Sequence, residues 1–106
     1  MSETFFGLEE RILHTKDELA QREALLTSRG LTVPEGEELV LGLFDGEQLV
    51  ATGALVRNVL QGIAVDMSHE GEGVAAAIVS SLIKRAVDRG ITQIFLYTGY
   101  THFYIV

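Results

Sequence analysis

The spacing of apolar residues in the first third of the chain is that of a helix. Thr15-Lys16-Asp17-Glu18 fits a capping box at a helix start, and Gly30 supplies a left-handed stop. These signals predict a helix over residues 15–29. Its apolar stripe is made of Leu19, Leu25, Leu26 and the alanines between them. Before His14 the apolar residues allow either a short strand or a helical turn: Phe5, Phe6, Leu8 and Ile12.

Two tight turns divide the middle of the chain into three segments with the composition of strands. Asp45-Gly46 is suited to a two-residue hairpin turn, and Arg57-Asn58 can turn the chain again. We therefore predict an antiparallel meander with strands over residues 38–44, 49–56 and 59–65. Apolar residues are nearly continuous in the third strand, which indicates that both of its faces are covered.

The period then changes to about 3.6 residues, which predicts a helix over residues 73–89 that stops at Gly90. Its apolar positions are Val74, Ala75, Ile78, Val79, Leu82, Ile83 and Ala86. A short buried strand over residues 91–97 follows. Strand, glycine-bearing turn, helix and strand form a βαβ unit with parallel strands. The predicted fold class is α/β with a mixed sheet.

Composition limits the classes of protein to which the chain can belong. The 106 residues contain no cysteine and 47% hydrophobic residues, which predicts one globular domain over residues 1–106 and excludes a disulfide scaffold. No apolar run approaches the roughly 20 residues that cross a bilayer, and the N-terminus lacks the pattern of a signal peptide. We therefore expect a cytoplasmic location and no membrane partner.

The charge balance is acidic. Fifteen Asp and Glu residues against eight Lys and Arg give a formal net charge of −7. Such a chain repels phosphate backbones, so a nucleic acid is not an expected partner. The three histidines show no metal-ligand spacing, and no metal site is predicted. The acids Glu35, Glu37 and Glu38 surround Pro34 and are interpreted as a solvated loop rather than as a catalytic base.

The segment Gly71-Glu72-Gly73-Val74-Ala75 lies between a predicted buried strand and a predicted helix. Glycines there let the backbone turn sharply and present several amides at a helix start, an arrangement suited to phosphate or pyrophosphate. A turn that only connects the strand to the helix is the alternative. With Ala76 the segment also matches a dinucleotide fingerprint, but no acid follows Asp88 to bind ribose hydroxyls. We therefore exclude that fold.

The order of the elements resembles the GNAT superfamily of acyl-CoA-dependent acetyltransferases. Its motif of Arg or Gln, two residues, Gly, one residue, and Gly or Ala falls on Glu70, Gly73 and Ala75. Two stretches are similar, more specifically, to the N-terminal domain of citrate lyase ligases. They are Asn58–Val65 followed by Gly71–Ala75, and Phe44-Asp45-Gly46 leading to Leu49–Gly53. The resemblance covers residues 15–98.

This resemblance implies a GNAT-like acyl-CoA N-acyltransferase fold that binds acetyl-CoA. By position, the pyrophosphate would meet the backbone amides of Gly71, Glu72, Gly73, Val74 and Ala75. The pantetheine arm and the thioester would face Ile63, Ala64 and Val65. A strand amide would polarise the acetyl carbonyl, and an unidentified amine would attack it directly.

The chain also departs from the family pattern. Glu70 replaces the Arg or Gln and is predicted to weaken the binding of an anionic cofactor. Only Thr98–Val106 follow the last predicted strand, so we expect a fold that is short or truncated at the C-terminus. The alternative function is a non-catalytic GNAT-like binding or interaction module, as in the N-terminal domain of a citrate lyase ligase-type enzyme.

Two further expectations concern the C-terminal part. In the family a tyrosine near the thioester commonly protonates the leaving thiolate, which makes Tyr97 and Tyr100 the candidate general acids. From the sequence, packing is the expected role of Tyr97 and exposure that of Tyr100. Thr101–Val106 ends in apolar and β-branched residues, which predicts a homodimer in which this segment, or the sheet edge that it should cover, pairs with a second copy of the chain.

Overall fold

The computed structural model describes the backbone of residues 4–5, 7–97 and 102–104, and the side chains of residues 7–97. In this part of the chain seven strands form one sheet in sequence order. They are β1 (Thr4–Phe5), β2 (Leu8–Ile12), β3 (Leu39–Asp45), β4 (Gln48–Val56), β5 (Val59–Val65), β6 (Phe95–Tyr97) and β7 (His102–Tyr104). Neighbouring strands are antiparallel except for β5 and β6, which are parallel. The predicted mixed sheet with one parallel crossover is confirmed.

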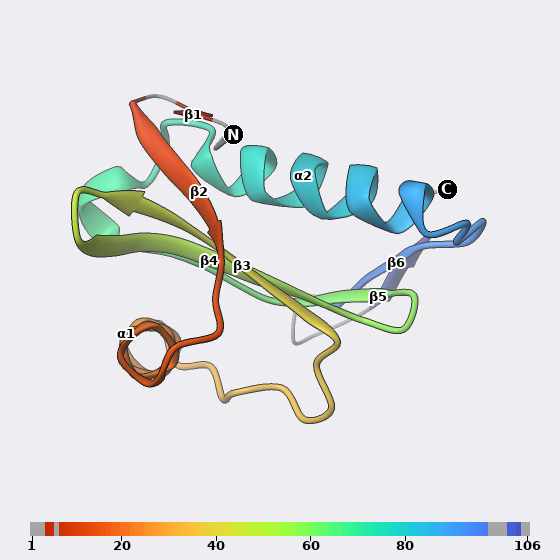
Figure 1. Cartoon of the computed structure of the whole chain (residues 1–106), viewed down its shortest axis with the longest axis horizontal. Coiled ribbons are helices and arrows are strands. Elements are labelled where there is room, and N and C mark those ends of the chain that lie inside the picture. The colour runs from red at the N-terminus through yellow and green to blue at the C-terminus, as the bar shows by residue number, and fades with distance from the viewer. Residues whose placement is uncertain (1–3, 6, 98–101, 105–106) are drawn as a thin grey trace.

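Two helices cover opposite faces of the sheet, α1 (Lys16–Ser28) on one side and α2 (Val74–Asp88) on the other (Figure 1). Each helix closes its own hydrophobic core. Leu26 of α1 belongs to a buried cluster with Phe44 of β3. Ile78 and Leu82 of α2 belong to a second cluster with Leu41 of β3. A short 3-10 helix, η1 (Met67–His69), lies between β5 and α2.

The predicted boundaries agree with the structure to within one residue for both helices and the three central strands. The capping box of α1 is present, with Thr15 accepting from the Glu18 amide. The N-terminal apolar segment forms β1 and β2, the strand alternative. The first hairpin turn consists of Gly46 and Glu47, one residue later than predicted, because Asp45 already pairs with Gln48.

Two predictions, one about strand length and one about burial, were wrong. The last strand of the βαβ unit begins at Phe95 and is shorter than residues 91–97, because the amide of Ile91 donates to the Ala86 carbonyl at 3.1 Å and closes the end of α2. In α1, Leu19 is 39% exposed, whereas Arg22 is buried in its place on the inner face. The prediction that both faces of β5 are covered is confirmed, since both helices contact it, but only Leu60 and Ala64 are buried because the strand borders two cavities.

A β-bulge reshapes β5 beside one of these cavities. Thr52 pairs with Ala64 and Ala54 pairs with Gln61, so that two residues of β5 lie opposite Gly53. One of the two, Gly62, has φ +63°, which glycine adopts without strain. The other is Ile63, the first residue of β5 that the sequence assigned to a cofactor, and a bulge generally increases the local twist of its strand.

The C-terminal strand has a partner within the same chain. β7 pairs antiparallel with β6, from Phe95 opposite Tyr104 to Tyr97 opposite His102. The remaining residues of the predicted edge strand, 101 and 105–106, lie outside the described part. The homodimer therefore stays a prediction: residues 102–104 pair with β6 on one side, and within the described residues no strand pairs with the other edge of β7.

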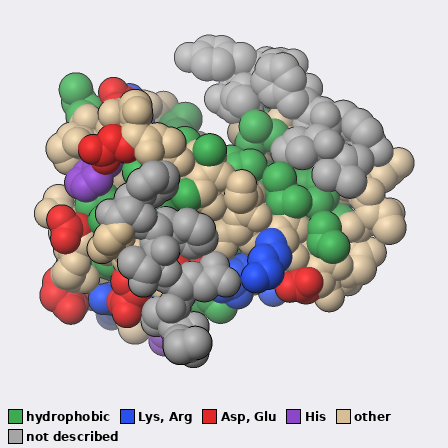
Figure 2. All heavy atoms as spheres, turned by 90° about the horizontal axis from the view of Figure 1, so that it is seen from above, with side chains coloured by type: hydrophobic (Ala, Val, Ile, Leu, Met, Phe, Trp, Pro, Cys, Tyr) green, Lys and Arg blue, Asp and Glu red, His purple; other side chains and the backbone are tan. Residues whose placement is uncertain are grey.

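The face of the molecule on the α2 side carries exposed apolar side chains between charged ones (Figure 2). Val87 of α2 is 54% exposed.

Within the described residues, neither helix combines the length and apolar character needed to cross a bilayer.

Candidate functional site

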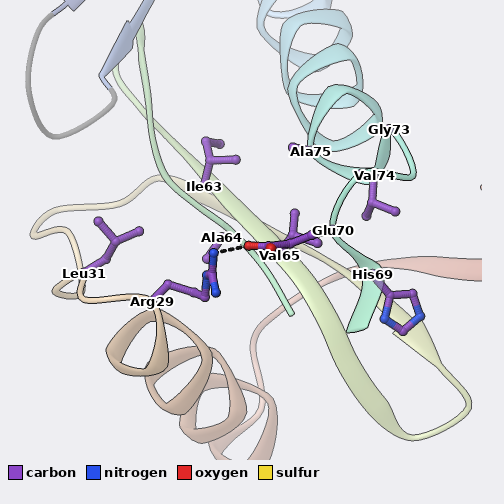
Figure 3. Close-up of a pocket in the computed structure, with 11 residues that line it drawn as sticks. Arg29, Leu31, Ile63, Ala64, Val65, His69, Glu70, Gly73, Val74 and Ala75 are labelled. Atoms are coloured by element: carbon purple, nitrogen blue, oxygen red, sulfur yellow. Dashed lines mark hydrogen bonds and ion pairs between the residues drawn. The ribbon is translucent and has the colours of Figure 1, made fainter. Parts of the chain in front are cut away.

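A cavity of about 380 Å³ lies between the end of α1, the second half of β5 and the turn that leads into α2 (Figure 3). Three chain segments that are far apart in the sequence form its walls. The lining residues are Arg29, Leu31, Ile63, Ala64, Val65, His69, Glu70, Gly71, Gly73, Val74 and Ala75. Both polar and apolar surfaces are therefore available to a ligand.

The floor of the cavity is a stretch of β5 that has separated from β6. The two strands pair only at Val59 with Phe95 and at Leu60 with Leu96. β5 continues to Val65, and among the described residues no strand pairs with the outer edge of residues 61–65. An extended ligand can therefore lie along this edge and use its backbone groups as a neighbouring strand would.

The turn before α2 leaves the first amides of the helix without a side-chain cap. Its N-cap residue Gly73 has φ +79°, a left-handed conformation that favours glycine, and it has no side chain to accept a hydrogen bond. At α1, by contrast, Thr15 and Glu18 satisfy the helix start. The backbone amides of Val74 and Ala75 and the positive end of the α2 dipole are thus left to an external anion.

The opposite wall is fixed by the way in which α1 ends. Gly30 has φ +75°, and its amide donates to the Thr27 carbonyl at 3.0 Å. The Leu31 amide donates to the Leu26 carbonyl at 2.9 Å, which completes a Schellman motif. This motif places Arg29, the C-cap residue, and Leu31 at the cavity.

Arg29 and Glu70 form an ion pair between the end of α1 and the turn before α2 (Figure 3). The side chains are 31% and 47% exposed. Sequence reasoning found Glu70 but not Arg29. The stop signal at Gly30 locates Arg29 at a helix end, yet no local pattern reveals a partner 41 residues away.

A small polar cluster stands at the η1 side of the cavity. The Ser68 hydroxyl donates to the Asp66 carboxylate, and its oxygen lies 3.0 Å from Nδ1 of His69. Hydrogen bonds from the Ser68 hydroxyl and from the amides of Ser68 and Met67 hold the pKa of Asp66 below its usual range, against a smaller effect of burial. Because the Ser68 proton is directed to Asp66, the cluster is not arranged as a nucleophile with its general base.

Seven of the eight residues that the sequence assigned to a cofactor line this one cavity, and Glu72 does not. The side chains of Ile63 and Val65 pack against the α2 core, whereas Ala64 belongs to the α1 core. This alternation follows from the strand period. The structure therefore brings the candidates together, while their role in binding stays a prediction.

A second cavity of about 270 Å³ continues along β5 beside the bulge. It is lined by Leu31, Thr32, Pro34, Gln61, Gly62 and Tyr97, so Leu31 is shared with the first cavity. Tyr97 is not packed as the sequence predicts, because it is 36% exposed at this opening. Tyr100, the other candidate general acid, lies outside the described residues.

The loop acids are not all solvated, contrary to the prediction. Glu37 accepts a hydrogen bond at 2.8 Å from Nη1 of Arg22, whose side chain is only 2% exposed. Burial raises the pKa of Glu37, but the hydrogen bond from Arg22, the one from its own backbone amide and the positive charge of Arg22 together lower it by more, so the net shift is downward. An acid held ionised by a buried guanidinium is a poor proton acceptor, which argues against Glu37 as the base.

Comparisons with known proteins agree with the resemblance found in the sequence. The model of the acetyltransferase (GNAT) family matches residues 4–104. The [citrate [pro-3S]-lyase] ligase of Haemophilus influenzae is 32% identical over 90 residues, which cover 84% of this chain and 27% of that protein. The corresponding ligase of Escherichia coli is 30% identical over 80 residues, or 76% of this chain and 23% of that protein. The chain thus spans about a quarter of the length of these relatives.

Solved structures show the same fold at low sequence identity. An acetyltransferase of Trypanosoma brucei superposes with a TM-score of 0.73 at 17% identity, covering 88% of this chain and 84% of that one. The predicted GNAT-like fold is confirmed. With the family model matching nearly the whole length and a relative above 30% identity, this chain belongs to the GNAT family of acetyltransferases.

Proposed function

We propose that this domain binds acetyl-CoA in the 380 Å³ cavity and transfers the acetyl group to an amine. One observation carries the proposal: the edge of β5 that no strand in the described part of the chain pairs with, and the start of α2 without a side-chain cap, border the same cavity. The pantetheine arm would lie along residues 63–65, and the pyrophosphate would meet the amides at the start of α2. Membership of the GNAT family supports this assignment.

The transfer needs no covalent intermediate on the protein. The neutral amine nitrogen attacks the thioester carbonyl carbon, the C–N bond forms, and the C–S bond breaks. A strand amide in residues 63–65 would donate to the carbonyl oxygen as negative charge develops there. The proton lost by the amine reaches solvent, and the thiolate of CoA takes up a proton, for which Tyr97 is the candidate donor.

The second cavity is the proposed place for the amine. It shares Leu31 with the first cavity and includes Gln61 and Tyr97, so an amine there would approach from the side of the thioester. No Lys or Arg is among its lining residues within the described part of the chain. Its described polar side chains are those of Thr32, Gln61 and Tyr97, which can form hydrogen bonds with a neutral amine.

The test is titration with CoA and acetyl-CoA, using NAD as a control that shares the adenosine diphosphate group. A ligand concentration of about one hundred times the dissociation constant stabilises the native state by about 2.7 kcal/mol. This stabilisation raises the melting temperature by roughly 10 °C. Stabilisation by CoA and not by NAD supports the site, and no response to CoA contradicts it. Thiol release from acetyl-CoA with a panel of amines then separates an enzyme from the alternative, a non-catalytic binding module.

A further inference from the structure

We propose that Arg29 is the cation that receives the phosphates of the ligand, and that Glu70 holds its guanidinium while the cavity is empty. The inference rests on the proposed function, and it adds a binding residue from α1 and a counter-ion that the ligand must replace. Among the described residues that line the cavity, Arg29 is the one Lys or Arg.

The backbone holds Arg29 in place before any ligand arrives. Its amide donates to the Leu26 carbonyl at 3.0 Å, and the left-handed Gly30 follows it. The side chain then extends toward Glu70, which precedes the turn that exposes the amides of α2 (Figure 3). An anion at the start of α2 would therefore meet backbone donors on one side and a guanidinium on the other.

The ion pair is suited to exchange rather than to permanent structure. Both side chains are partly exposed, and such pairs contribute little net stabilisation in water. A pyrophosphate presents more charge and more acceptor oxygens than one carboxylate, and the planar guanidinium can bind it through two parallel hydrogen bonds. Released Glu70, already 47% exposed, can be solvated at small cost.

Glu70 then has two opposing effects on the ligand. It orients Arg29 within the cavity, but it also competes for Arg29 and repels phosphate. The sequence alone predicted only the repulsion. The structure adds that the carboxylate is paired, so its removal frees a cation as well as eliminating a like charge.

The experiment measures CoA affinity for wild type, Arg29→Gln, Glu70→Gln and the double variant. Arg89→Gln is the matched control. Arg89 is the C-cap of α2, which ends with the same hydrogen-bond pattern as α1, and it does not line the cavity. We expect Arg29→Gln to weaken binding about ten-fold or more and Arg89→Gln to leave it within two-fold. Glu70→Gln should strengthen binding about two- to five-fold.

The double variant decides between direct contact and mere neutralisation. If Arg29 contacts phosphate, the double variant binds as weakly as Arg29→Gln or nearly so. If Arg29 serves only to neutralise Glu70, the double variant binds like wild type, and the inference is overturned. Thermal melts of all variants show that each is folded.

Inorganic tripolyphosphate separates this inference from the proposed function. Wild type that binds tripolyphosphate through Arg29 but does not bind CoA would overturn the proposed function and retain the anion site. If wild type and Arg29→Gln bind CoA with equal affinity, the inference is overturned and the proposed function is retained. Binding of neither ligand would overturn both.

Discussion

Gly53 of β4 lies so close to Ile78 of α2 that a Cβ atom at Gly53 would come within 2.6 Å of the Ile78 Cγ2 atom. The same Cβ would lie 2.7 Å from Cδ1 of Ile63 and 2.9 Å from Cδ1 of Leu82. Because Gly53 has no side chain, α2 packs closely against β4 beside the cavity. It therefore links packing of the core to the position of the helix start that faces the ligand.

Gly53→Ala is expected to destabilise the fold by about 1–3 kcal/mol, because the methyl group overpacks a filled core. Chemical denaturation with an unchanged m-value measures this loss. In an Ile78→Ala background there is room for the added methyl group. The loss of stability caused by Gly53→Ala should therefore be smaller. Equal costs in the two backgrounds would show that the Ile78 side chain does not cause the strain.

The buried guanidinium of Arg22 gives a second prediction. Among the described residues, its Nε and Nη2 atoms have no hydrogen-bond partner, and Glu37 supplies the one at Nη1. Glu37→Ala leaves a buried charge without compensation and should cost about 3 kcal/mol, whereas Arg22→Met should be close to neutral. Glu35→Ala, an exposed acid of the same loop, is the control and should change stability by about 0.5 kcal/mol or less. Equal effects of Glu35→Ala and Glu37→Ala in urea denaturation would refute the pairing.

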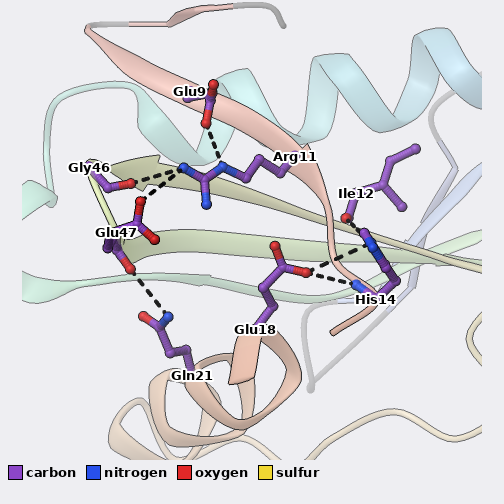
Figure 4. Close-up of polar contacts among 8 residues, drawn as sticks. All are labelled: Glu9, Arg11, Ile12, His14, Glu18, Gln21, Gly46 and Glu47. Atoms are coloured by element: carbon purple, nitrogen blue, oxygen red, sulfur yellow. Dashed lines mark hydrogen bonds and ion pairs between the residues drawn. The ribbon is translucent and has the colours of Figure 1, made fainter. Parts of the chain in front are cut away.

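The capping box of α1 predicts a dependence of stability on pH, and Figure 4 shows the contacts of its Glu18 carboxylate with His14. Hydrogen bonds from the amides of His14 and Thr15 lower the pKa of Glu18 from its ordinary value of 4.5. The ionised form is therefore favoured in the folded state. The contribution of ionised Glu18 to the free energy of unfolding is fully present above pH 4.5, and it is lost as the pH falls through the folded-state pKa.

Glu18→Gln should consequently cost about 0.5–1 kcal/mol at pH 7, and the difference from wild type should shrink as the pH falls below 4.5. Urea denaturation at several pH values measures this difference. Glu23→Gln, on the exposed side of the same helix, is the control for the loss of one negative charge. A cost for Glu18→Gln that is constant down to pH 3 would contradict the assigned role.

Local signals in the sequence predicted most of the fold. Gly30 and Gly90 stop their helices through left-handed backbone, and Thr15 with Glu18 starts α1, so these boundaries depend on neighbouring residues only. The glycine turn before α2 was recognised for the same reason. The βαβ order of strand, turn, helix and strand likewise predicted that β5 and β6 are parallel.

What the sequence did not predict depends on contacts between distant segments. Arg22 replaces Leu19 on the inner face of α1 because Glu37 compensates its charge, and nothing near Arg22 in the sequence shows this. The ion pair of Arg29 with Glu70 likewise needs the two walls of the cavity to be assembled first. The bulge at Gly62 depends on pairing with β4, and a helix or strand period does not reveal it.

Gly73→Asp tests the anion site at the start of α2. A carboxylate at this N-cap position can accept the hydrogen bonds of the first helical amides and repels phosphate, so CoA affinity should fall by more than about ten-fold. Gly73→Asn is the matched control. Asn is as large as Asp and also tolerates the left-handed backbone of φ +79°, but it adds no charge.

The comparison of Gly73→Asp with Gly73→Asn separates the effect of charge on CoA affinity from the effect of backbone strain. Both should lose similar stability, because both place a side chain at a positive φ. In isothermal titration with CoA, Gly73→Asn should retain measurable binding, while Gly73→Asp should show a loss that grows as the salt concentration is lowered, since repulsion is then less screened. If both variants bind CoA equally at every salt concentration, the phosphates do not lie at the start of α2, and the ligand must use another part of the cavity.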